Sequence, residues 1–99
     1  MKVVYTDTAR RHIASKIGYL VDQCARYPAK RLKSRILVFI RTVLAAHPGA
    51  GYHIAEHDIY ESWIPDTPYV VIYRVDKSMR QLVVLALFHS SQDRSRFKP

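Results

Sequence analysis

Three histidines near the middle of the chain, His47, His53 and His57, are the residues whose spacing could bind a metal ion. His53 and His57 stand four residues apart, and on a helix that spacing would bring both imidazoles to one ion. On a strand, four residues span about 13 Å, which is too far for a shared metal. Because residues 52–64 are predicted to form one strand, or two short strands around a bend, we expect no metal site and no cofactor.

The single cysteine, Cys24, is another candidate for reactive chemistry, and it falls on the apolar stripe of a predicted helix. A small buried side chain is the expected role there, in preference to a nucleophile. One cysteine cannot form an internal disulfide, and a reducing cytoplasm is the simplest compartment. The N-terminus turns polar too early for a secretion signal, and no apolar run approaches the roughly 20 residues that cross a bilayer. We therefore expect a cytoplasmic protein.

Positive charge is concentrated in the first half of the chain. Residues 1–48 carry ten Lys and Arg against two Asp, whereas residues 49–99 carry six against six Asp and Glu, so the first half holds the whole net charge of +8. Such asymmetry indicates an acidic partner, whether nucleic acid, ribosome, membrane surface or acidic protein, although a solvated helix face is the plain alternative. The basic residues that could contact such a partner are Arg10, Arg11, Lys30, Arg31, Lys33, Arg35 and Arg41.

Two predicted helices carry these basic residues. Lys2 to Tyr5 is predicted to be a strand, and residues 6–8 supply capping side chains for a helix over about residues 8–26. Tyr27-Pro28 is expected to end that helix, and a second helix is expected over about residues 29–46. Apolar residues recur every three or four positions in both segments, so the short link between them predicts an antiparallel helical hairpin with one apolar face.

The end of the chain is predicted to be a β-hairpin. Tyr69–Val75 and Leu82–Phe88 are rich in β-branched, aromatic and other apolar residues, and a polar stretch separates them. Strands that are apolar on both faces need cover on both faces. The chain therefore predicts a single α+β domain over residues 1–99, in the order strand, helix, helix, strand, strand, strand, with the helical hairpin packed on a small, twisted, mostly antiparallel sheet.

Motifs on these elements resemble those of the RelE/ParE superfamily of bacterial toxins from type II toxin–antitoxin modules, also called plasmid-stabilisation proteins. The likeness rests on Val4–Ala9 at the start of the first helix, on Pro48–Gly51 after the second, on Thr67–Val75 and on Leu87–Arg94. The resemblance implies a toxin that an acidic cognate antitoxin wraps and neutralises, with no membrane partner.

The superfamily implies two activities, and one pattern favours the second. RelE-like members cut mRNA on the ribosome, and ParE-like members inhibit DNA gyrase without a known catalytic centre. RelE-like ribonucleases tend to place Arg directly after the Tyr that opens the third strand, where this chain has Val70 after Tyr69. The Pro-Tyr-aliphatic pattern is more typical of ParE-like members. We therefore expect a gyrase inhibitor that acts by binding, with Trp63 and the basic residues contacting antitoxin or target.

The ribonuclease alternative depends on His89. Some relatives end the fourth strand with a His that serves in acid–base catalysis, and an imidazole with a pKa of about 6.5 suits that role. Arg74 and Arg94 would then hold the phosphate, and Glu61 would act as the partner base. The plainer role for His89 is hydrogen bonding at the strand end. A third possibility is a non-toxic remnant that only binds the antitoxin.

Overall fold

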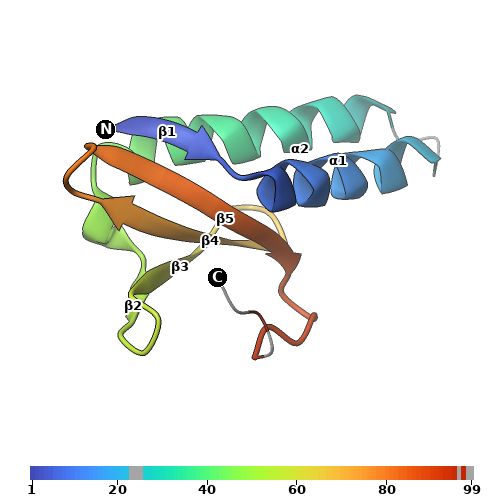
Figure 1. Ribbon diagram of the computed structural model, residues 1–99. Helices are drawn as coiled ribbons and strands as arrows, with labels where there is room; N and C mark the ends of the chain where they lie inside the picture. The colour runs from blue at the N-terminus through green and yellow to red at the C-terminus, as the bar shows by residue number, and fades with distance from the viewer. Residues whose placement is uncertain (23–25, 96, 98–99) are drawn as a thin grey trace.

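The computed structural model describes residues 1–22, 26–95 and 97, and it consists of one sheet with helices on one side (Figure 1). The sheet has five strands in the order β1-β5-β4-β3-β2, with β1 parallel to β5 and the other neighbours antiparallel. The predicted α+β fold is confirmed, and four strands follow the helices where the predicted order had three, because residues 52–64 form two strands. The helical elements are α1 (Asp7–Asp22), α2 (Arg26–Phe39), the π-helical turn η1 (Ile40–Leu44) and the 3-10 turn η2 (Pro48–Ala50), and the strands are β1 (Lys2–Tyr5), β2 (Tyr52–Ile54), β3 (Ile59–Trp63), β4 (Tyr69–Asp76) and β5 (Gln81–His89).

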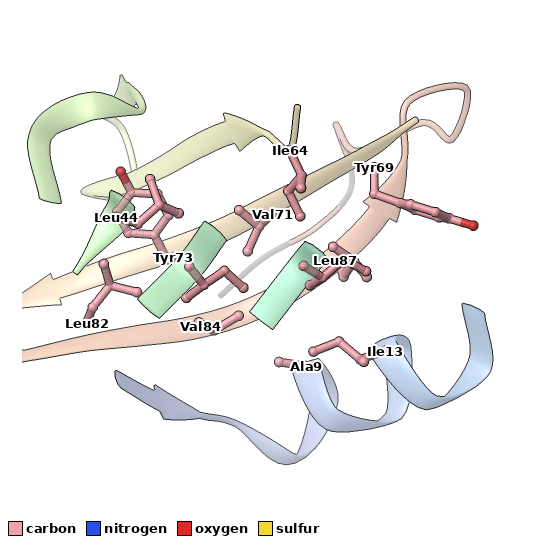
Figure 2. Close-up of a cluster of buried hydrophobic side chains, with 12 residues drawn as sticks. Ala9, Ile13, Leu44, Ile64, Tyr69, Val71, Tyr73, Leu82, Val84 and Leu87 are labelled. Carbon is pink, nitrogen blue, oxygen red and sulfur yellow. The ribbon is translucent and has the colours of Figure 1, made fainter. Parts of the chain in front are cut away.

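The main hydrophobic core lies between the helices and the sheet. Figure 2 shows Val84 and Leu87 of β5 on the side of Ala9 and Ile13 of α1, and Tyr73 of β4 beside Leu44 of η1. The remaining helical contribution comes from α2 and η1, where apolar residues recur every four positions on the covered side. These fully buried residues are Ile36, Ile40 and Leu44.

A smaller apolar cluster lies on the other face of the sheet. It contains Ile59 and Ile72, together with Leu85 and Ala86, which stand at a β-bulge in β5. The chain after β5 turns back beneath this face, away from the helices (Figure 1), and Phe97 contributes to the cluster. Both faces of the central hairpin are therefore covered, as its apolar sequence predicts, but by layers of very different thickness.

Thr6 joins the first helix to the bulge of β5. Its hydroxyl accepts a hydrogen bond from the backbone N–H of Ala9 (3.1 Å), which caps α1, and donates one to the carbonyl of Leu85 (3.2 Å). Where β1 no longer pairs with β5, His12 of α1 takes over, because its Nδ1 accepts from the N–H of Leu87 (3.2 Å). The start of α1 thus covers part of the β5 edge.

The predicted helix boundary at Tyr27-Pro28 is wrong. Arg26 already begins α2, so Pro28 stands in the first turn, where its missing N–H would have no intrahelical acceptor in any case. The second helix ends earlier than residue 46 and changes to the π form at Ile40. Cys24 lies outside the described residues. Of the two alternatives for residues 52–64, two short strands around a turn is the correct one.

Candidate functional site

An apolar groove runs along the helical hairpin and has a basic rim. It has a volume of about 630 Å³, and the side chains of Ile13, Ile17 and Leu37 lie along it. Arg10 of α1 and Lys33 of α2 line the same groove, and both side chains are exposed. An amphipathic acidic segment would fit this combination, since its apolar side chains could enter the groove while its carboxylates meet the two cations.

The predicted basic residues all lie on the helical layer and are exposed. Arg10 and Arg11 belong to α1, the middle four belong to α2, and Arg41 belongs to η1. Arg35 forms an ion pair with Asp66 (2.7 Å), so part of its charge is neutralised within the chain. The remaining members of the set are Lys30, Arg31 and Lys33.

Trp63 is predicted to contact a partner together with the basic residues, but it lies on the face of the sheet that the helices do not cover. It is 57% exposed at the end of β3, and the guanidinium carbon of Arg94 lies 5.9 Å from its ring centroid. The predicted contact residues therefore belong to two surfaces, because the alternation of β3 sends Trp63 to the face that the helices do not cover.

Two of the four predicted catalytic residues meet in an ion pair. Arg94 donates from its terminal nitrogen to Glu61 Oε1 (3.0 Å) and from Nε to Oε2 (3.3 Å), and a further nitrogen donates to the carbonyl of Ser90 (3.3 Å). Both side chains are about one-fifth exposed. Such a two-point pair holds the guanidinium in a fixed plane. Arg94 would have to leave Glu61 before it could hold a phosphate.

The other two predicted catalytic residues lie at opposite ends of the β4–β5 ladder. His89 pairs with Tyr69 and Arg74 pairs with Val83, so five residues of β4, or about 17 Å, separate the two positions. His89 Nδ1 accepts from the backbone N–H of Ser91 (3.1 Å), and the centroid of its ring lies 5.6 Å from that of Tyr69 in a T-shaped arrangement. These contacts match the plainer role of a hydrogen-bonding residue at the strand end.

The histidines weighed as metal ligands have other surroundings. His53 Nε2 lies 2.8 Å from Asp58 Oδ1, and the His53 ring packs on Tyr60 at 4.7 Å. His57 stands in the turn between β2 and β3. Among residues 1–22, 26–95 and 97, no group of three or more His, Cys, Asp or Glu side chains could hold a metal ion.

Two structural centres were not singled out from the sequence. His12, described above, has a pKa held below its ordinary value, first by burial and then by the positive charges of Lys16 and Arg11. The hydroxyl of Tyr73 donates to the carbonyl of Pro48 (2.8 Å) and accepts from the N–H of Gly51 (3.1 Å), so it fixes the loop before β2. The only sequence signal for this second centre is the Pro-Gly-rich loop itself, which does not name its partner.

Comparison with known proteins places these features in a family. A family model described as the ParE toxin of the type II toxin–antitoxin system, parDE, matches residues 3–94. A search of curated proteins finds no match. Among the described residues, no helix is long and apolar enough to span a membrane.

Solved structures of toxin–antitoxin systems have a similar fold. The chain is similar to one from the chromosomal ParDE system of P. aeruginosa, with 17% identity, a TM-score of 0.72, and coverage of 90% of this chain and 95% of that one. It is also similar to one from the RelBE2 toxin–antitoxin complex of Mycobacterium tuberculosis, with 21% identity, a TM-score of 0.68, and coverage of 89% and 95%. For the isolated E. coli RelE toxin the identity is 12%, the TM-score 0.54, and the coverage 93% and 86%.

Proposed function

We propose a function from the premise that the chain belongs to the ParE toxin family of type II toxin–antitoxin systems. We infer that it inhibits DNA gyrase by binding, as one domain acting in the cytoplasm, and that an acidic cognate antitoxin neutralises it. The observation that carries the proposal is the family match over residues 3–94.

The geometry of the candidate catalytic residues supports binding over RNA cleavage. Cleavage at a 2′-hydroxyl needs a base, an acid and cations arranged around one phosphate. Here Arg74 and His89 stand about 17 Å apart along β4 and β5, and Arg94 is paired with Glu61. A single phosphate could not contact all of these groups without a large rearrangement.

The helical hairpin is the proposed antitoxin surface. Its groove offers apolar side chains flanked by Arg10 and Lys33, and the surrounding helices carry the rest of the basic set. An acidic amphipathic segment would bury apolar area there and gain electrostatic attraction, which raises the association rate and favours the acidic partner over others.

A supercoiling assay tests the gyrase proposal. The purified chain, added to DNA gyrase with relaxed plasmid, should block supercoiling in a dose-dependent manner, and added antitoxin should restore it. The ribonuclease alternative predicts cuts in translated mRNA that His89→Ala removes. Intact gyrase activity at saturating toxin, together with such cuts, would overturn the proposal. Growth that is untouched by expression would favour the non-toxic remnant.

A charge-reversal pair tests the antitoxin surface. Arg10→Glu with Lys33→Glu should weaken antitoxin binding by about 100-fold, because two attractive contacts become repulsive. Lys2→Glu with Lys77→Glu makes the same change in net charge at two exposed residues outside the groove and should leave affinity within about threefold. Titration calorimetry at two salt concentrations measures both variants. Equal losses in the two variants would reduce the proposed surface to a non-specific charge effect.

A further inference from the structure

The face of the sheet opposite the helices contains a pocket of about 580 Å³. Ile54, Ile59 and Ile72 of the sheet line it, together with Phe97 from the chain after β5. The other lining residues are polar or charged, and a pocket of this size can accept one or more side chains of a partner. The charges at its mouth and the aromatic residues beside it indicate which partner would fit.

Two exposed aromatic side chains lie on this face, at diagonal positions of adjacent strands. Tyr52 of β2 pairs with Glu61, and Trp63 lies two residues farther along β3, so the three side chains project from the same side. Diagonal neighbours on adjacent strands lie about 7–8 Å apart, within reach of aromatic rings. Tyr52 is 76% exposed and Trp63 is also mostly exposed. Exposed Trp and Tyr side chains next to a pocket are typical of binding hot spots.

The described residues that line the pocket include more acidic than basic side chains, although the chain as a whole carries +8. Among the described residues of the lining, Arg94 is the single Arg, and Glu61 neutralises it. Asp93 accepts hydrogen bonds from the hydroxyl (2.7 Å) and the N–H (2.9 Å) of Ser95, and these bonds hold the pKa of its carboxyl below the ordinary value. Glu56 is 83% exposed, and the ring of His57 lies 3.9 Å from it. Glu56 and Asp93 therefore present negative charge to an incoming partner.

We infer that this face binds a basic segment of a protein partner, with an apolar side chain in the pocket and flanking Lys or Arg against Glu56 and Asp93. Trp63 and Tyr52 would contact the same cations through their ring faces. Nucleic acid is the less suitable occupant, because its phosphates would meet these two carboxylates. The inference deepens the proposed function: this face contacts the target of the toxin, while the basic groove contacts the acidic antitoxin.

The lone tryptophan makes the inference directly measurable. Trp63 is the only Trp in the sequence, so its emission reports on this face alone. The probe is a short synthetic peptide with a leucine flanked by lysine and arginine, and its matched control replaces each cation with glutamate. The basic peptide should change the emission in a saturable manner, with a dissociation constant below about 1 mM. Added salt should weaken the binding of this peptide. The acidic peptide should leave the emission unchanged.

Two double variants locate the binding. Glu56→Lys with Asp93→Lys should weaken the affinity for the basic peptide by about tenfold or more. Arg10→Glu with Lys33→Glu should leave that affinity unchanged. Because Asp93 also orders the chain near Ser95, Glu56→Lys alone is measured as well and should give a smaller loss in the same direction. Equal binding of the acidic peptide, or no saturable change with either peptide, would overturn the inference.

The target assay separates this inference from the proposed function. In the supercoiling assay, Glu56→Lys with Asp93→Lys and, separately, Trp63→Ala should lose inhibition and keep antitoxin binding. Full inhibition by these variants would show that the target contacts another surface, which overturns the inference while gyrase inhibition stands. A wild-type chain that does not inhibit gyrase would remove the proposed function, and the peptide titration would still decide the chemistry of the face.

Discussion

The two faces of the sheet differ in cover, charge and side-chain type. The helical face is covered by α1, α2 and η1, is basic, and has a narrow apolar groove lined by Arg10 and Lys33. The opposite face is covered mainly by the chain after β5, has acidic residues around its pocket, and exposes Tyr52 and Trp63. The basic residues of the helices and the acidic residues that line the pocket therefore lie on different faces, although the net charge is +8. A small protein arranged in this way can offer different surfaces to two partners of opposite character.

The largest expected difference between the faces is in stability. Leu44→Ala removes a fully buried side chain under the helical layer and should lower the free energy of unfolding by about 3 kcal/mol. Phe97→Ala, in the thin cover of the other face, should lower it by only about 1 kcal/mol, because that side chain is half-buried. Urea denaturation monitored by circular dichroism measures both. Similar losses would mean that the two layers contribute equally.

The next largest effect on stability is expected on the helical face, where the hydroxyl of Tyr73 binds the loop before β2. Tyr73→Phe should cost about 1–2 kcal/mol, since the Pro48 carbonyl and the Gly51 N–H both lose their partner. A Cβ on Gly51 would lie 2.6 Å from the Tyr73 hydroxyl, so Gly51→Ala should be destabilising as well.

A double-mutant cycle tests whether these two effects share one cause. Gly51→Ala should cost less in the Tyr73→Phe background, because the atom nearest to the new methyl group is gone. Strict additivity in urea denaturation would show that the clash is relieved in another way, for example by a shift of the loop.

A smaller effect is expected for the ion pair on the other face. Arg94→Ala should lower stability by about 1 kcal/mol, and it should also change the emission of Trp63, over which the guanidinium lies. Glu61→Gln is the matched change, because it keeps the shape and removes the charge. If Arg94→Ala altered mRNA cleavage instead of stability, the catalytic assignment of Arg94 would regain support.

The smallest expected effect is the pH dependence of stability that His12 contributes where α1 meets β5. Because its pKa is lowered in the folded chain, mainly by burial, the unfolded chain takes up a proton more readily. This contribution to stability is fully present above about pH 6.5, which is the pKa of a histidine in an unfolded chain, and it declines as the pH falls below that value. His12→Asn, whose amide oxygen can accept from Leu87, should flatten the decline.

Urea midpoints at about pH 7.5 and about pH 5.5 measure this slope. His47→Asn is the control, since His47 is an exposed histidine beyond the end of η1. An unchanged slope in His12→Asn would assign the acid sensitivity to other groups.

Local pattern explains most of the correct predictions. The runs Tyr69–Val75 and Leu82–Phe88 are apolar enough to require strands with cover on both faces, and the structure has both. The boundary at Pro28 could not be predicted from the residue pair alone, because Pro suits the first turn of a helix as well as the end of the previous one. The candidate site was harder to predict from the sequence than the fold. Trp63 and the basic residues look like one group in sequence, and the pleat of β3 separates them.

The sequence by itself determined the α+β order of elements, the basic character of the helices and the family, since these depend on period, composition and short motifs read along the chain. Only the tertiary structure decided that Glu61 holds Arg94, that His89 and Arg74 lie apart, and that Glu56, Asp93 and Trp63 share one face. The reason is physical. Strand pairing and the return of the chain after β5 set distances between residues that are far apart in sequence, and no local propensity encodes those distances.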